Sequence, residues 1–130
     1  MIVVDASVLA VALGDDGHDG AVARDRLIRE VLTAPELIDL EVVSVWRKQT
    51  VIGKMDKRRA ELAVTDLMTM PLRRAPHAVL LRRCWELRHN LTIYDAAYLA
   101  LAELLDVTLV TADAAIASVR KVSCHVELLR

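Results

Sequence analysis

The sequence predicts a single domain, residues 1–130, of the three-layer α/β/α class with a central, mainly parallel sheet. Two observations predict this class. Short runs rich in β-branched residues alternate with longer segments of helical periodicity, which implies right-handed crossovers and helices on both faces of a parallel sheet. A chain of 130 residues, 55% of them hydrophobic, can also build one core without metal or disulfide staples.

The first half of the chain predicts one strand, three helices and an extended segment. The strand is expected at residues 2–4, the helices at residues 7–13, 19–33 and 40–51, and the extended segment at residues 34–38. The first helix should stop at the glycines and aspartates of residues 14–17, which favour turns. Pro35 favours extended backbone in the residue before it. Asp39 is a candidate N-cap for the third helix.

The second half continues the alternation. Helices are expected at residues 57–68, 77–88, 96–105 and 113–119, and strands at residues 107–111 and 124–129. Pro71 and Pro76 bracket a short extended piece between the first two of these helices. Thr92 or Asp95 should begin the helix at 96–105, which is rich in Ala and Leu.

The composition excludes several protein classes. No apolar run approaches the ~18–20 residues of a membrane span, and Asp5 interrupts the apolar start too early for a signal peptide. We therefore expect a cytoplasmic protein with no membrane partner. Cys84 and Cys124 are too few and too far apart for a disulfide framework or a zinc-binding pair, so both should be reduced and buried.

Positive charge is concentrated in the middle of the chain. Residues 1–46 carry a net charge of -6, residues 47–88 one of +7 and residues 89–130 one of -2. The basic clusters are Arg47-Lys48, Lys57-Arg58-Arg59, Arg73-Arg74 and Arg82-Arg83. They could contact a polyanion through its phosphates or be solvated helix faces. Trp46 and Trp85 lie on apolar helical faces, where packing in the core or at a subunit interface is expected.

Four acids stand where the predicted fold gives them a common location. Asp5 follows the first strand, and Asp113 comes two residues after the strand at 107–111; the carboxyl ends of parallel strands open on the same side. Glu41 and Asp95 begin helices in apolar surroundings. Each acid also has a local interpretation, as a helix N-cap or as a charge that suits the helix dipole.

If these four carboxylates converge, they need protons or a cation. Two carboxylates about 5 Å apart repel by roughly 3 kcal/mol at an effective dielectric of about 20, so six pairs sum to ~10–20 kcal/mol. That sum rivals the stability of a typical domain, about 5–15 kcal/mol. Oxygen ligands without His or Cys suit Mg²⁺ or Mn²⁺, and such a site suits phosphodiester hydrolysis. Ser7 and Thr111 could orient a ligand or a water there, or cap their helices.

Four segments around these acids carry a more specific signal. They are VVDAS at residues 3–7, LIDLEV at 37–42, TIYDAAYLALAE at 92–103 and LVTAD at 109–113. Together they resemble a PIN domain, and more narrowly the VapC ribonuclease toxins of bacterial toxin–antitoxin pairs. The resemblance implies a PIN-like fold and a metal-dependent endoribonuclease. In it Asp5, Glu41, Asp95 and Asp113 hold Mg²⁺ or Mn²⁺, and Ser7 and Thr111 match supporting hydroxyls.

The resemblance also implies partners. They are a second copy in a homodimer, a VapB-like antitoxin whose C-terminal segment covers the active-site groove, a larger toxin–antitoxin assembly, and structured RNA, either transfer or ribosomal, as substrate. Val42, Val45 and Trp46 could help to form the antitoxin groove. Some PIN domains carry a further acid soon after the last one, but residues 114–117 are AAIA. A second tightly held metal is therefore not implied.

Other functions fit the acids less well. A phosphatase of the haloacid dehalogenase type needs a second Asp at the position of Ser7, and a receiver domain needs clustered acids where Asp5 stands alone. The main alternative is a PIN-like module that binds RNA or protein with little or no nuclease activity. The presence of all four acids favours catalysis over this alternative.

Overall fold

Five parallel strands form the central sheet of the computed structural model, which describes residues 1–130. The strands are β1 (Ile2–Val4), β2 (Leu32–Pro35), β3 (Leu72–Ala75), β4 (Thr108–Thr111) and β5 (Val126–Leu128). Their order in the sheet is β3-β2-β1-β4-β5, and every neighbouring pair is parallel. The predicted fold class is confirmed, and the sheet is parallel throughout.

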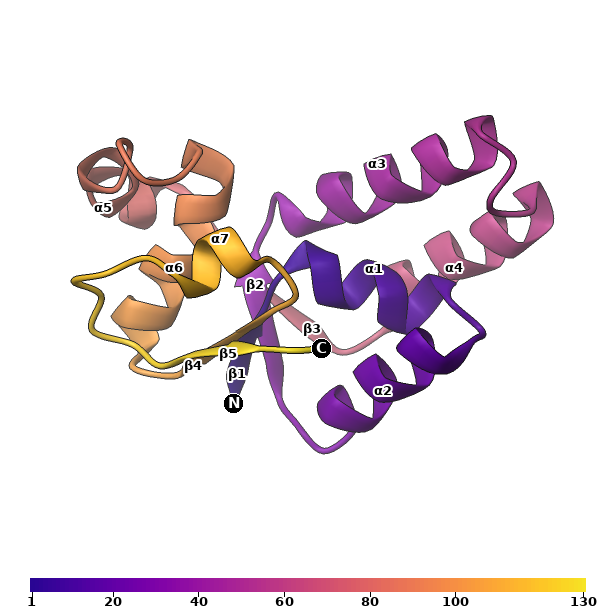
Figure 1. Ribbon diagram of the computed structural model, residues 1–130, viewed down its shortest axis with the longest axis horizontal. Coiled ribbons are helices and arrows are strands. Elements are labelled where there is room, and N and C mark those ends of the chain that lie inside the picture. The colour runs from indigo at the N-terminus through magenta and orange to yellow at the C-terminus, as the bar shows by residue number, and fades with distance from the viewer.

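Helices cover both faces of this sheet. They are α1 (Ala6–Gly14), α2 (His18–Leu27), α3 (Ile38–Val51), α4 (Lys57–Thr69), the 3₁₀ turn η1 (Ala78–Leu80), α5 (Leu81–Glu86), α6 (Ile93–Leu105) and α7 (Ala114–Ala117). In Figure 1, α1 to α4 gather on one side of the strands and α5 to α7 on the other. The chain leaves the central strand β1 toward β2 and later returns on its other side with β4. The switch point of the sheet therefore lies between β1 and β4. Parallel sheets of this kind bind ligands at the switch point, beyond the carboxyl ends of the strands.

Several predicted boundaries are wrong. Leu32 and Thr33, expected at the end of a helix, belong to β2, because this strand lies between β1 and β3 and all its residues are buried. A buried parallel strand shows a continuous apolar run without alternation, so its periodicity does not separate it from a helix. The expected helix at 77–88 is shorter, with η1 and then α5 ending at Glu86.

The start of α3 also differs from the prediction. The N-cap position is Leu37, not Asp39, and the Leu37 N–H donates to Nε2 of His77 at 3.0 Å. Asp39 instead accepts a hydrogen bond from Nε of Arg74 at 2.7 Å. His77, 40 residues away in the sequence, thus accepts the N–H of the N-cap residue itself, and no side chain caps the first turn of α3.

Trp46 fixes α3 against α1. Its side chain is 1% exposed, and its indole N–H donates to the carbonyl oxygen of Ala10 at 3.1 Å. A Cβ on Gly14 would stand 2.5 Å from the indole nitrogen, so the ring needs a glycine there. Trp46 is therefore a core residue, as expected, and it orients the helix that carries Glu41.

Three other expectations concern Trp85, the two cysteines and membrane-spanning helices. Trp85 is 63% exposed, so a core position is wrong for it, and the guanidinium of Arg88 lies 4.4 Å from the centre of its ring. Both cysteines are free, as expected; Cys84 is buried but Cys124 only partly so. None of the helices combines the length and the apolar character that crossing a membrane would require.

Candidate active site

The structure brings all four predicted carboxylates to one pocket of about 440 Å³ at the carboxyl ends of β1 and β4. Asp5 directly follows β1, and Asp113 comes two residues after β4. Glu41 and Asp95 come from the first turns of α3 and α6. Two strand ends and two helix starts therefore meet at the switch point of the sheet.

Asp5 is the most buried of the four, with 4% of its surface exposed. One carboxylate oxygen, Oδ2, accepts hydrogen bonds from the hydroxyls of Ser7 at 2.6 Å and Thr111 at 2.8 Å. Asp5 occupies the N-cap position of α1, but its side chain makes no capping hydrogen bond. Asp5 therefore stands at the N-cap position, as the local interpretation predicts, but its carboxylate does not cap the helix.

Ser7 and Thr111 also bind the loop after β4. The Ser7 hydroxyl oxygen accepts from the N–H of Ala112, and the Thr111 hydroxyl oxygen accepts from the N–H of Asp113, both at 3.0 Å. Each hydroxyl therefore joins the Asp5 carboxylate to the backbone that carries Asp113. The two predicted supporting residues orient Asp5 itself, and neither caps its helix.

Glu41 has a buried partner that the sequence analysis missed. The hydroxyl of Tyr98, a fully buried residue of α6, donates to Oε1 of Glu41 at 2.6 Å. In the sequence Tyr98 resembles one more apolar residue of a core helix. The available signal was its spacing of three residues from Asp95, which places both side chains on one face of the helix.

Of the other two acids, Asp113 caps a helix and Asp95 does not. Thr92 is the N-cap of α6 and accepts from the N–H of Asp95, so Asp95 is not the cap. Asp113 is the N-cap of α7, where its Oδ1 accepts from the N–H of Ala115 at 2.8 Å. Capping occupies only one carboxylate oxygen, so it is compatible with a second role for Asp113.

The environment of the pocket disfavours the ionised form of three of its carboxyl groups. Burial raises the pKa values of Asp5, Glu41 and Asp95 above their ordinary range. Neighbouring carboxylates raise them further: Asp113 acts on Asp5, Asp5 and Asp95 act on Glu41, and Asp5 and Asp113 act on Asp95. Hydrogen bonds from Ser7, Thr111 and Tyr98 oppose these shifts without cancelling them. The mutual repulsion expected from the sequence is therefore present.

A family model described as PIN domain matches residues 2–122. The chain belongs to the PIN-domain family. It is 36% identical over 129 residues to Ribonuclease VapC1 of Mycobacterium tuberculosis, covering 98% of this chain and 97% of that protein. It is 39% identical over 137 residues to Ribonuclease VapC9 of the same organism, covering 99% and 98%. The similarity to VapC proteins expected from the four segments is thus confirmed over nearly the full length.

A solved structure supports the fold of this PIN domain independently. The crystal structure of Mycobacterium tuberculosis VapC20, described as a sarcin–ricin loop cleaving toxin, superposes with a TM-score of 0.66. The match covers 84% of this chain and 87% of that one at 18% sequence identity. At this identity the likeness shows a shared fold and no more.

The PIN domain offers oxygen donors of the right kind for a hard cation. Asp5, Glu41 and Asp113 each keep one carboxylate oxygen that receives no hydrogen bond, and these residues line the same pocket as Asp95. Carboxylate oxygens without His or Cys match the preference of Mg²⁺ and Mn²⁺. No three of these acids lie close enough together to form a ready-made cluster for one cation. The donor chemistry fits such an ion, although the donors are not yet gathered around one point.

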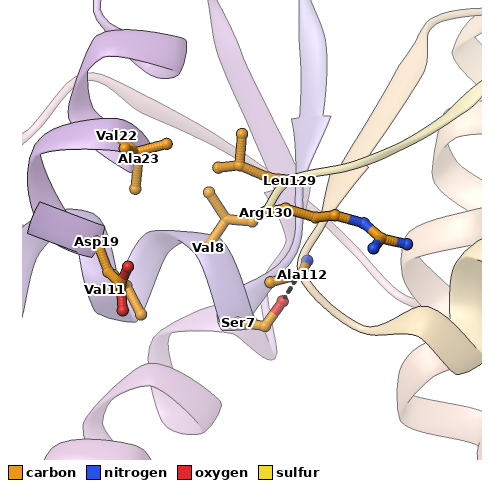
Figure 2. Close-up of a pocket in the computed structure, with 9 residues that line it drawn as sticks. All are labelled: Ser7, Val8, Val11, Asp19, Val22, Ala23, Ala112, Leu129 and Arg130. Carbon is orange, nitrogen blue, oxygen red and sulfur yellow. Dashed lines mark hydrogen bonds between the residues drawn. The ribbon is translucent and has the colours of Figure 1, made fainter.

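A second hollow lies beside Ser7, between α1, α2 and the C-terminal residues (Figure 2). It measures about 210 Å³, and its lining is mostly apolar, including Val8, Val11 and Leu129. Figure 2 shows the Arg130 guanidinium extending away from these side chains. None of the four candidate carboxylates lines this hollow, so we assign it to packing around α1 and not to the candidate active site.

Proposed function

We propose that this PIN domain is a Mg²⁺- or Mn²⁺-dependent endoribonuclease, the toxin of a toxin–antitoxin pair, which cleaves structured RNA. The observation that carries the proposal is the meeting of Asp5, Glu41, Asp95 and Asp113 in one open pocket. The similarity to proteins named Ribonuclease VapC supports the reaction class. A pocket of this acidity is unfavourable for a polyanion unless a cation neutralises it, which supports metal dependence.

The four acids would hold the cation, and other residues of the chain would hold the acids. Bound Mg²⁺ or Mn²⁺ would supply polarisation of the phosphoryl group and activation of a water for in-line attack. Ser7 and Thr111 hold the Asp5 carboxylate, and Tyr98 holds that of Glu41. These contacts restrict both carboxylates before any ligand binds, which reduces the entropic cost of forming the site.

Protons should compete with the cation for these carboxylates. A carboxyl with a raised pKa keeps its proton to higher pH, and only the ionised form binds a metal ion. Activity should therefore fall as the pH drops through the raised pKa values, at a higher pH than for solvent-exposed carboxylates.

We propose the partners of a VapC toxin for this chain: a homodimer and a VapB-like antitoxin, with a larger complex of the two. One part of the expected groove needs correction. Val42 and Trp46 are fully buried and cannot contact an antitoxin, whereas Val45 and Leu40 line the acidic pocket. Leu40, at 77% exposure, is the apolar residue of α3 most available to a partner.

The proposal is tested by Asp5→Asn and Asp95→Asn, with Asp106→Asn as the control. Asp106 lies outside the pocket in the left-handed conformation at the end of α6, which Asn adopts readily. We expect cleavage of total RNA to fall at least about 100-fold in the two pocket variants and to be unchanged in the control. Mapping new 5′ ends on transfer and ribosomal RNA measures the cleavage and identifies the substrate.

The fold of the pocket variants provides a second readout. Burial, and then the neighbouring charges of Asp5 and Asp113, raise the pKa of Asp95, so its ionised form is destabilising at neutral pH. Removal of this charge should leave the thermal midpoint equal or slightly higher. Full activity in either pocket variant would contradict the catalytic assignment. RNA binding without cleavage by the wild-type protein would favour the alternative, a PIN-like binding module.

A further inference from the structure

Lys48 is the one basic side chain that lines the acidic pocket. It is exposed on α3, and none of the seven ion pairs of the structure involves it. If the role of Lys48 were only to balance the charge of the four carboxylates, its ammonium group would be expected to pair with one of them. Its ammonium group is instead available to a ligand.

The position of Lys48 on α3 gives it a direction relative to the acids. Glu41, Ser44, Val45 and Lys48 line the pocket at successive turns of one helix face. Lys48 lies seven positions after Glu41 on the helix, which corresponds to about 10 Å along the axis. The neighbouring Arg47 faces elsewhere, into a different hollow between α3 and α4. The acidic end and the basic end of the pocket are therefore distinct.

The other basic clusters are less suited to the substrate at this site. Arg59 and Arg74, from clusters that the sequence marked as candidates, are engaged with Asp16 and Asp39. Arg83 is engaged with Glu86 and Glu103. None of these arginines lines the acidic pocket.

We propose that Lys48 binds a backbone phosphate of the RNA next to the one that is cleaved, so that the substrate strand runs along α3 from Glu41 toward Lys48. This inference rests on the proposed function and adds to it a substrate-binding residue and a path for the strand. A lysine ammonium is a compact charge that suits a phosphate, and RNA bound through phosphates needs no aromatic stacking surface.

The test compares Lys48→Gln, Lys48→Arg and Arg47→Gln. The probe is a fluorescein-labelled, mixed-sequence 20-nucleotide RNA. Its binding is followed by anisotropy at a fixed Mg²⁺ concentration and several KCl concentrations, and each protein also carries Asp95→Asn to prevent cleavage. Arg47→Gln is a matched control because it removes one exposed charge from the adjacent position of the same helix. We expect Lys48→Gln to weaken binding about three- to tenfold and to reduce the slope of log affinity against log salt by about 0.7–0.9. Lys48→Arg should bind like the wild type.

Steady-state cleavage in Mg²⁺ gives the second readout. Lys48→Gln should raise KM by a similar factor and change kcat by less than about twofold, since uniform substrate binding is lost. Equal affinity and equal salt slope in Lys48→Gln and Arg47→Gln would overturn the inference. A loss of kcat at unchanged KM would also overturn it and assign Lys48 to charge balance among the acids.

Failure of this inference is distinguishable from failure of the proposed function. Cleavage by the wild-type protein together with unchanged RNA binding in Lys48→Gln contradicts the Lys48 contact alone. RNA binding that depends on Lys48, without any cleavage by the wild-type protein, contradicts the nuclease function and retains the phosphate contact.

Discussion

Asp5 occupies a helix N-cap position, yet its carboxylate hydrogen-bonds to two hydroxyls brought together from β4 and α1. Thr111 is 106 residues away in the sequence and fully buried, so this contact exists only in the folded protein. Both hydroxyls bind Oδ2 and leave Oδ1 without a donor. The sequence shows only an acid at a strand–helix junction. In the structure its carboxylate is oriented by two hydroxyls, and one of its oxygens is available.

Tyr98 supports a prediction about the orientation of Glu41. Tyr98→Phe removes the hydroxyl that donates to Glu41 and keeps the ring in the core. We expect Mn²⁺ affinity, measured by calorimetry, to fall about tenfold, the effect typical of losing a partner that orients a metal ligand. Tyr94→Phe is the control, since Tyr94 lines the same pocket one turn earlier in the chain and makes no hydrogen bond to Glu41. Equal affinities of the two variants would contradict a positioning role for Tyr98.

The residues that could be predicted differ in kind from those that could not. Asp5 and Asp113 follow strands, so the rule that strand ends share an edge locates them without any knowledge of side-chain packing. Tyr98 was missed, and Lys48 was named only as part of one basic cluster among four, because local patterns do not show which helix faces turn toward the pocket. The Tyr98–Glu41 contact spans 57 residues of sequence, and no local pattern encodes it.

At the scale of the elements, three basic clusters separate into an inner and an outer arginine. Arg59, Arg74 and Arg83 are partly buried, and each forms an ion pair that joins its helix or strand to another helix or, for Arg59, to the loop between α1 and α2. Their neighbours are exposed: Arg58, Arg73 and Arg82. Neither of the two interpretations, polyanion contact or solvated helix face, fits the inner arginines, and contact with a polyanion stays a prediction for the outer ones.

Arg83 and Arg82 provide a test of this division. Arg83 donates to Glu103 at 2.7 Å and to the carbonyl oxygen of Lys121 at 3.1 Å, which joins α5 to α6 and to the loop before β5. Arg83→Gln should lower the free energy of unfolding by about 1–3 kcal/mol, because Glu103 loses its charged partner and keeps only the hydrogen bonds from Ser123. Arg82→Gln should change it by less than about 0.5 kcal/mol. Urea unfolding measures both, and equal effects would contradict the division.

The contribution of the Arg83–Glu103 ion pair to stability should depend on pH. Burial raises the pKa of Glu103, but hydrogen bonds from Arg83 and Ser123 outweigh it and hold the pKa below the ordinary range. A lowered pKa of an acid stabilises the fold above its unfolded-state pKa, and this contribution is lost as the pH falls. The difference between the wild type and Arg83→Gln should therefore shrink when unfolding is measured at about pH 3. An undiminished difference would indicate packing, not charge, as its origin.

Element boundaries were predictable where special residues mark them. Thr92 begins α6 and the two prolines frame β3 as expected. The boundary between α2 and β2 was missed because a buried central strand has no alternation to distinguish it from a helix. The predicted cap of α3 was wrong because Asp39 lies inside the helix and accepts a hydrogen bond from Arg74 of the distant strand β3. In both cases tertiary contacts overrode the local signal.

At the scale of the whole molecule, the uneven charge along the chain is partly compensated inside the fold. Two ion pairs, Asp16–Arg59 and Asp39–Arg74, join the acidic first third to the basic middle third. The net charge of +7 in residues 47–88 thus overstates the positive surface available to RNA. The alternation of strands and helices along the chain does predict a parallel sheet, and with it the shared side of the sheet on which Asp5 and Asp113 follow their strands.

The central claim is that these four carboxylates act through a divalent cation. The most direct measurement is cleavage of total RNA by the wild-type protein before and after dialysis against EDTA, followed by addition of Mg²⁺ or Mn²⁺. We expect cleavage to disappear on chelation and to return with either ion, because repulsion among the acids leaves the pocket unsuited to a phosphate without one. Cleavage undiminished by EDTA would contradict the central claim.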